Sequence, residues 1–272
     1  MLRLLVLSVV LASAYCAQPG IYRPDLVTDN SRIIKGEDAK EGEFPYIVSL
    51  HFTKNRKHAC GASVLTKRWL LTAGHCCDHK FEMYVVADTI FLSKNDTTHE
   101  MEARKIHPEY RPYDLWMNDA CLIKLKTPMK FTKNLQQVTL PPSGYKVGGN
   151  EKVTIVGWGY TRPNVDNPQV PDRLQVGRGF IALDNAHCRK VVNNAVYDSH
   201  ICVKGEQWGM GACNGDSGSP LTNQKGVQVG IASWVYQPCA VGLPDFYARL
   251  PLFIDWIKKE LGSEASELKF AR

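Results

Sequence analysis

Three residues of this chain could together carry out nucleophilic chemistry. Ser217 lies in the run GDSGSP at residues 215–220, where small neighbours leave its hydroxyl open. A serine nucleophile needs a base that takes its proton and hydrogen-bond donors for the oxyanion that it creates. His75, in LTAGHC at residues 71–76, could be the base, and Asp119, which opens an apolar run, could orient the histidine. These residue types predict acyl transfer through a covalent serine intermediate.

Each of these residues, taken alone, also has a structural interpretation. A serine between glycines usually marks a turn, a histidine beside a cysteine is usually structural, and an aspartate before an apolar run often caps a strand. The order histidine, aspartate, serine, with spacings of 44 and 98 residues, argues against coincidence. This order differs from that of subtilisins and α/β-hydrolases, and the serine run lacks the final glycine of a Gly-x-Ser-x-Gly elbow.

Over about residues 33 to 262 the chain resembles the trypsin/chymotrypsin family of secreted serine endopeptidases. RIIKG at 32–36 resembles the activation site of that family, FPYIVSL at 44–50 its first strand, and GWG at 157–159 and SW at 233–234 parts of its second half. The resemblance implies an all-β fold of two six-stranded Greek-key β-barrels with a C-terminal helix, the barrels meeting near residue 140. His75 and Asp119 would come from the first barrel and Ser217 from the second.

The local pattern agrees with an all-β chain. Short runs rich in β-branched and aromatic residues, broken by Gly, Pro and Asn, predict strands. These runs are residues 46–52, 62–65, 69–72, 120–125, 152–156, 175–182, 228–234 and 245–249. Only residues 252–261 show a clear helical period.

The two ends of the chain predict processing rather than further domains. A basic start followed by a short apolar run is typical of a signal peptide and is too short to cross a bilayer. We therefore expect a signal peptide at about residues 1–17, an activation propeptide at 18–32, the protease domain at 33–262 and a polar, partly disordered tail at 263–272. The protein is expected to be secreted and extracellular, without a membrane anchor.

Nine cysteines are typical of an oxidising compartment. Cys16 lies at the end of the signal peptide, which leaves eight. The family resemblance implies the bridges Cys60–Cys76, Cys188–Cys202 and Cys213–Cys239, so Cys77 and Cys121 remain. Each of these two follows His75 or Asp119 by two positions, and since those side chains must touch, a Cys77–Cys121 bridge is geometrically reasonable. A metal cluster at residues 75–79 is the weaker interpretation, because His75 and Cys76 already have other roles.

The resemblance also assigns roles around the reacting bond. The backbone N–H groups of Gly215 and Ser217 would form the oxyanion hole, and Ser233, Trp234 and Val235 would lie along the substrate backbone. No metal or organic cofactor is needed. The expected partners are protein or peptide substrates, a trypsin-like activating protease and protein protease inhibitors, and the protein is expected to be a monomer. The net charge of +6 comes from scattered basic residues, so no nucleic-acid partner is expected.

The substrate pocket departs from that of trypsins. Gly211 stands where trypsins carry the aspartate that recognises Lys or Arg, Ala212 follows it, and Val235 should narrow the entrance. Asp245 brings a carboxylate from the opposite wall, a combination that resembles neutrophil elastases and, in part, collagenolytic brachyurins. We favour small to medium aliphatic residues before the cut bond. Basic or broad specificity through Asp245 is the alternative.

Activation is expected by a cut between Arg32 and Ile33. In the family mechanism the new ammonium of Ile33 inserts beside Asp216 and forms the oxyanion hole.

An alternative function is that of a non-catalytic homologue that acts as a binding protein. None of the three reactive residues is lost, however. The sequon at Asn95 could carry a glycan.

Overall fold

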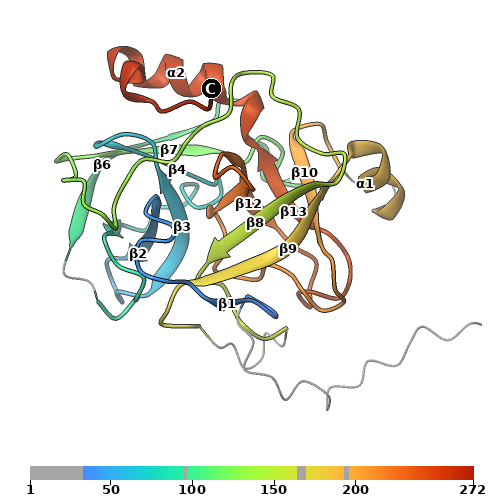
Figure 1. Cartoon of the computed structure of the whole chain (residues 1–272). Coiled ribbons are helices and arrows are strands. Elements are labelled where there is room, and N and C mark those ends of the chain that lie inside the picture. Colours follow the sequence, from blue (N-terminus) through green and yellow to red (C-terminus); the bar gives the residue numbers. More distant parts are fainter. Residues whose placement is uncertain (1–32, 95–96, 164–169, 193–195) are drawn as a thin grey trace, which may run out of the picture. The chain divides into compact units, whose positions relative to one another are not determined.

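The computed structural model describes residues 33–94, 97–163, 170–192 and 196–272 of this 272-residue chain. The expected signal peptide, the propeptide with Arg32, and Asn95 lie outside these residues. Strands make up most of the regular structure, and the described helices are few and short (Figure 1). No helix among the described residues is long and apolar enough to cross a membrane.

The first barrel closes six antiparallel strands in the order β2-β3-β4-β7-β6-β5. Their bounds are β2 Ile47–Phe52, β3 His58–Val64, β4 Trp69–Thr72, β5 Met83–Val86, β6 Thr98–Ile106 and β7 Cys121–Leu125. β4 and β7 pair so that Thr72 faces Cys121. Because His75 follows β4 by three residues and Asp119 precedes β7 by two, this register brings them to the same end of the barrel.

The second barrel closes another six strands, in the order β8-β9-β10-β13-β12-β11, with β11 returning to β8. Their bounds are β8 Glu151–Gly157, β9 Gln175–Leu183, β10 His200–Gly205, β11 Pro220–Asn223, β12 Gln228–Trp234 and β13 Asp245–Arg249. The short β1, Glu37–Asp38, adds to the edge of β9. The all-β fold of two six-stranded barrels with a C-terminal helix is therefore confirmed.

Helices occupy the outside of the barrels. α1, Asn185–Val191, follows β9 and begins at Asp184, whose side chain accepts from the backbone N–H of His187. After the 3₁₀ turn η2, Leu250–Leu252, comes α2, Ile254–Leu261, which we expected at 252–261. α2 packs its apolar face into the core of the first barrel, and Lys105 in β6 contacts Glu260 at 2.7 Å (Figure 1).

The C-terminal segment differs from the partly disordered tail that we expected. Residues Gly262–Glu267 form the 3₁₀ helix η3, and the following residues pair with the segment between the barrels. Leu140 N donates to Lys269 O and Ala271 N donates to Leu140 O, both at 2.8 Å. Leu268 is buried in the first barrel's core. The segment is ordered because the buried side chain of Leu268 anchors it to the first barrel. The polar residues around Leu268 led us to expect disorder instead.

Candidate active site

Two hydrogen bonds join Asp119 and His75 at the centre of the site. The fully buried Asp119 accepts from His75 Nδ1 through Oδ2 and from the His75 backbone N–H through Oδ1, both at 2.8 Å. Ser233 in β12 donates its hydroxyl to Asp119 Oδ2 at 2.6 Å. These bonds fix the imidazole with Nδ1 protonated, which leaves Nε2 unprotonated and able to act as a base. Nε2 lies 3.8 Å from Cys76 Sγ, a disulfide sulfur that has no proton to donate. The contact from Ser233 to Asp119 was not anticipated, since 114 residues separate the two.

Ser217 lies in a tight turn before β11. Its carbonyl accepts from the backbone N–H of Gly61 in β3 at 2.8 Å, so the first barrel supports the turn directly. Gly218 has a φ of +77°, and a Cβ there would lie 2.1 Å from Thr72 Oγ1 and 2.4 Å from Gly61 O. Only glycine fits this turn. Ser217 and His75 line the same cavity, although among the described contacts no hydrogen bond joins them. Such contacts often tighten only when substrate binds.

The backbone N–H groups of Gly215 and Ser217 lie on the same turn. Within the part of the chain that the structure describes, neither donates to another protein group, so both are available to an oxyanion. His58 supports this turn, because its Nε2 donates to Gly215 O at 2.8 Å while Ser49 Oγ donates to its Nδ1 at 2.7 Å. Burial lowers the pKa of His58 to about 4, so the ring stays neutral. Sequence reasoning missed His58, which stands at the start of a strand without any motif.

Asp216 is buried, although it is also one of the residues that line the cavity. Its carboxylate accepts from the backbone N–H groups of Gly159 at 2.8 Å and Cys213 at 3.0 Å. Burial raises its pKa from 3.8 to about 6, which these two bonds counteract only in part. Ile33 is fully buried in the core of the second barrel, and Ile34 bridges to Gly211. The expected cut site therefore adjoins a segment that already packs beside the substrate pocket.

A cavity of about 300 Å³ lies next to Ser217 and His75. Trp234 at the end of β12 and Val235 directly after it, together with Ala212 and Tyr247, contribute to its walls. Trp116, which precedes Asp119, also lines it, and its ring centroid lies 6.4 Å from that of Trp234. Sequence reasoning placed Ala212 and residues 233–235 there but missed Trp116, whose preceding loop carries no regular pattern.

Asp245 and Gly211 lie behind this cavity rather than on its surface. Asp245 is buried, its Oδ2 accepts from the Ala212 backbone N–H at 2.6 Å, and neither Asp245 nor Gly211 is among the residues that line the cavity. Burial raises the pKa of Asp245 well above its usual range, because the charged carboxylate is poorly solvated there. A carboxyl group that is buried behind the cavity attracts a cationic side chain less than a carboxylate exposed on the cavity surface would.

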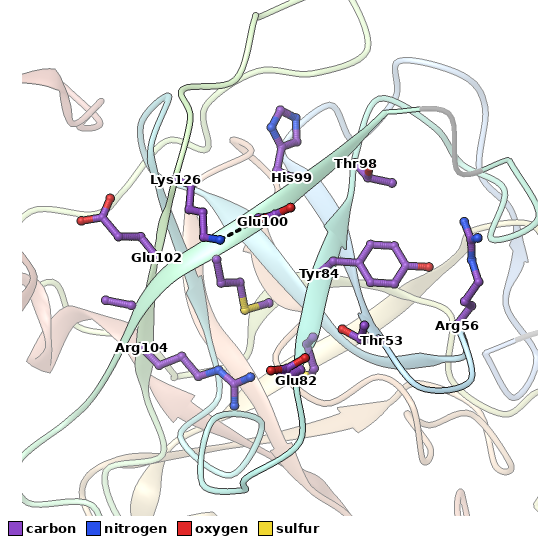
Figure 2. A pocket seen from close by; sticks show the side chains of 13 residues that line it. Thr53, Arg56, Glu82, Tyr84, Thr98, His99, Glu100, Glu102, Arg104 and Lys126 are labelled. Atoms are coloured by element: carbon purple, nitrogen blue, oxygen red, sulfur yellow. Dashed lines mark hydrogen bonds and ion pairs between the residues drawn. The ribbon is translucent and has the colours of Figure 1, made fainter.

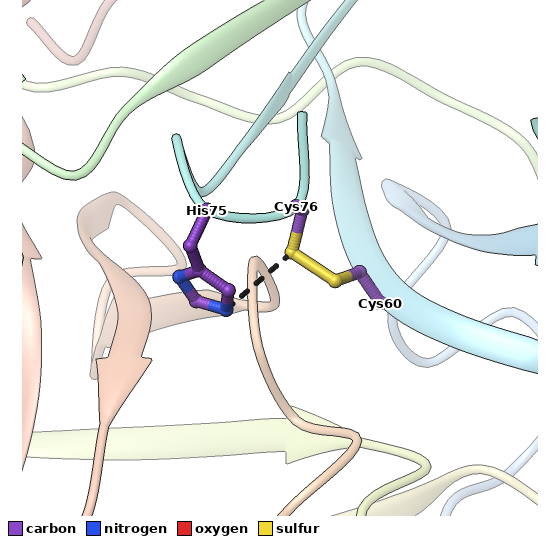
Figure 3. A group of neighbouring side chains, drawn as sticks. All are labelled: Cys60, His75 and Cys76. Carbon is purple, nitrogen blue, oxygen red and sulfur yellow. Dashed lines mark hydrogen bonds between the residues drawn. A yellow bond between two sulfur atoms is a disulfide. The ribbon is translucent and has the colours of Figure 1, made fainter. Parts of the chain in front are cut away.

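Four disulfides join the eight cysteines of the described residues in the pairs that we expected. They are Cys60–Cys76, Cys77–Cys121, Cys188–Cys202 and Cys213–Cys239. Cys60, His75 and Cys76 approach one another as metal ligands would, and Figure 3 shows why they do not form such a site. The two sulfurs are joined to each other and His75 is held by Asp119, so no thiolate is available to a metal.

Comparison with known proteins agrees with this geometry. The profile of the Trypsin family matches residues 33–257. The chain is 37% identical to Chymotrypsin-2 of Vespa crabro over 229 residues, covering 84% of this chain and 99% of that protein. It is 32% identical to Trypsin-1 of Astacus astacus over 239 residues, covering 83% of this chain and 98% of that protein. The chain therefore belongs to the trypsin family and is a serine endopeptidase.

Proposed function

We propose that the protein is a secreted endopeptidase, made as an inactive precursor, that cuts after small to medium aliphatic residues. The observation that carries the specificity is the cavity beside Ser217, in which Val235 forms part of the wall and the buried Asp245 lies behind Ala212. A cavity of about 300 Å³ without an exposed charge suits an uncharged side chain. The relative named Chymotrypsin-2 agrees with a preference other than Lys or Arg, whereas the one named Trypsin-1 keeps the basic alternative open.

The triad would act in two half-reactions. His75 Nε2 takes the Ser217 proton while Oγ attacks the substrate carbonyl, and the N–H groups of Gly215 and Ser217 bind the oxyanion. The carbon–nitrogen bond then breaks, and His75 delivers its proton to the departing amine. Water, deprotonated by His75, attacks the acyl-enzyme, and the serine regains its proton as the acid leaves. Asp119 stabilises the charged imidazole throughout.

Activation would follow the cut between Arg32 and Ile33. The cut creates an ammonium group at Ile33, and we propose the buried Asp216 carboxylate as its partner, because among the described residues two backbone N–H groups are the hydrogen-bond donors that compensate its charge. Pairing of the ammonium with Asp216 would fix the turn at Gly215 and Ser217.

The alternative is a non-catalytic homologue that acts as a binding protein. Such a protein would be expected to lack a residue of the triad, whereas this chain has the histidine, aspartate and serine at positions 75, 119 and 217.

A trypsin-treated and an untreated sample, each with Ser217→Ala as a control, test this proposal. We expect hydrolysis of peptides with Ala or Val before the cut only after treatment, and no activation of Arg32→Gln. Val235→Gly should shift the preference toward larger residues, and a further Asp245→Ser change should have little effect on Lys substrates. A parent enzyme that prefers Arg strongly over Ala would refute the specificity, and full activity of uncut Arg32→Gln would refute the activation step.

A further inference from the structure

A second surface with unusual chemistry lies next to His75, outside the cavity described above. It consists of the turn at residues 53–57, between β2 and β3, and the segment at residues 78–82, before β5. Thr53 N donates to Glu82 O at 2.9 Å and ties the two segments together. A hollow of about 420 Å³ lies between them, lined by Phe52, Thr53, Lys54, Asn55, Lys80, Phe81 and Glu82. We call these two segments, with Phe52, the basic-aromatic surface.

An aromatic cluster forms the centre of the basic-aromatic surface. The rings of Phe52, His79 and Phe81 lie 5.6 to 5.8 Å apart. Phe81 is 64% exposed although its backbone is held firmly, because Arg104 donates to the carbonyls of His79 at 3.1 Å and Phe81 at 2.7 Å. A large ring kept in water on a fixed backbone is an anchor for an apolar side chain of another molecule.

Positive charge surrounds this cluster. Lys54, Arg56, Lys57 and Lys80 are all exposed, and none of them forms an ion pair within the described residues. Two acidic residues are close, Asp78 and Glu82, and Glu82 already interacts with Arg104 and Lys126. The surface therefore carries an excess of uncompensated cations, which favours an anionic partner.

A second hollow, beside the basic-aromatic surface, differs from it in charge. It has a volume of about 710 Å³, is lined mainly by β5 and β6, and carries both acidic and basic side chains (Figure 2). Figure 2 shows Lys126 directed at Glu100, a contact of 2.5 Å. Glu102 is bound by Arg68 at 2.8 Å and Lys124 at 3.0 Å. Because this hollow mixes both signs of charge and its residues Lys126, Glu100 and Glu102 are in ion pairs, it has no comparable electrostatic preference.

Strand β3 and the segment of His75 link the basic-aromatic surface to the reacting centre. Lys57 directly precedes β3, and Gly61 in the same strand donates to Ser217 O at 2.8 Å. Four residues of strand span about 13 Å. His75 and His79 belong to one short segment, which the Cys60–Cys76 bridge attaches to β3. His75 gives its proton to the departing amine, so the departing part of a substrate leaves on this side, while residues 233–235 hold the acyl part.

We propose that the basic-aromatic surface binds the substrate segment on the carboxyl side of the cut bond, and that the enzyme favours segments which carry Asp or Glu there. This inference rests on the proposed triad. The lysine and arginine side chains attract the acidic segment, and an apolar residue within it packs on Phe81. Long, exposed side chains supply an attraction that salt screens, so the preference is strongest at low ionic strength.

Two internally quenched peptides test the inference. They share one acyl half with Val before the cut and differ only in the departing half, which contains either two Glu or two Gln residues around a Leu. We expect the activated enzyme to cut the Glu peptide with a kcat/KM about ten times higher at 20 mM salt, falling toward equality at 0.5 M. The variant Lys54→Gln/Lys57→Gln/Lys80→Gln should remove the difference.

A matched control changes three exposed lysines of the second half, Lys146→Gln/Lys190→Gln/Lys225→Gln, and should keep the ratio of the parent enzyme. Equal rates for both peptides at low salt, or an unchanged ratio in the first triple variant, would overturn the inference. A small valine ester, which has no peptide on the departing side, reports on the triad alone. If the activated parent enzyme did not hydrolyse this ester, the proposed function, and not the inference about the basic-aromatic surface, would be wrong.

Discussion

Asp119 accepts hydrogen bonds from residues of both barrels, so a substitution in either barrel can disturb the site. Two of its hydrogen bonds come from His75 and one comes from Ser233, which belongs to the second barrel. Removing Ser233 Oγ would leave the buried carboxylate short of one donor, a loss that typically costs about 1 to 3 kcal/mol. The position of the imidazole thus depends on the docking of the two barrels, not on the His75 loop alone.

The environment of Asp216 gives a prediction at a single glycine. A Cβ on Gly159 would lie 2.2 Å from Asp216 Oδ2 and 2.3 Å from its Cγ. Gly159→Ala should therefore displace the carboxylate next to Ser217, reduce kcat/KM at least tenfold and lower the unfolding free energy by about 1 to 3 kcal/mol. Peptide hydrolysis and urea unfolding measure the two effects.

Gly226→Ala is the control for this prediction. No atom lies within 4 Å of a Cβ at Gly226, but φ there is +72°, so the change adds backbone strain without a clash. It should cost about 1 kcal/mol and leave activity intact. Parental activity in Gly159→Ala would show that Asp216 is not held as described.

Among the elements, the Cys77–Cys121 bridge joins the loop of His75 to β7. It closes a loop of 44 residues, for which chain entropy predicts a stabilisation of about 4 kcal/mol. Cys77→Ser/Cys121→Ser should lose about 2 to 4 kcal/mol in urea unfolding and also lower kcat, because the spacing of His75 and Asp119 loosens. Cys188→Ser/Cys202→Ser, away from both residues, should lower stability with little change in kcat. Equal effects on kcat would contradict this distinction.

The loop before Asp119 is held in a strained shape by a contact from the second barrel. Leu115, Trp116 and Asn118 have φ values of 50°, 52° and 56°, each a cost of roughly 1 kcal/mol or more for a residue with a side chain. Tyr197 donates its hydroxyl to Asp114 in the same loop. We therefore expect this contact to keep Trp116 against the cavity.

Tyr197→Phe tests that role. It should raise KM several-fold for a peptide long enough to reach Trp116, while kcat/KM for a single-residue ester stays unchanged. Tyr113→Phe is a suitable control, since Tyr113 is fully exposed and has no such contact in the described structure. Unchanged KM in Tyr197→Phe would mean that the loop holds its shape without the hydroxyl.

The elements show which parts of the fold a sequence can reveal. Residues 69–72, 228–234 and 245–249 were predicted with the observed bounds, because each is a strongly apolar or aromatic run between breakers. β6 was missed because its THEMEARKI sequence is mostly polar, and it is a strand only through pairing with β5 and β7. α1 was missed although Asp184 is a good N-cap. The contacts of Ser233, His58 and Tyr197 join distant segments and leave no local pattern.

For the whole molecule, the cut at Ile33 should change the pH dependence of stability. In the uncut chain burial raises the pKa of Asp216 from 3.8 to about 6. A raised carboxyl pKa means that the folded state binds the proton more tightly, so stability falls as pH rises from about 4 to 6, by about 3 kcal/mol in total. A new ammonium partner would offset that loss.

Urea unfolding of cut and uncut Ser217→Ala protein measures this effect. We expect the cut form to be more stable by up to about 3 kcal/mol at pH 7, with the difference shrinking toward pH 4 as Asp216 is protonated. It should also shrink above about pH 8, as pH passes the raised pKa of the ammonium. A difference that does not vary with pH, or one that persists in Asp216→Asn, would contradict the pairing.

The packing of α2 has a consequence for how the protein is made. Ile254, Ile257, Leu261 and Leu268 complete the core of the first barrel, although they follow the last strand of the second barrel in the sequence. A ribosome makes these residues only after the second barrel, so the first barrel emerges early and stays unfinished while the second is translated. Its unfilled apolar groove then needs protection by a chaperone. A premature stop codon before residue 254 would leave that groove open permanently and direct the product to degradation.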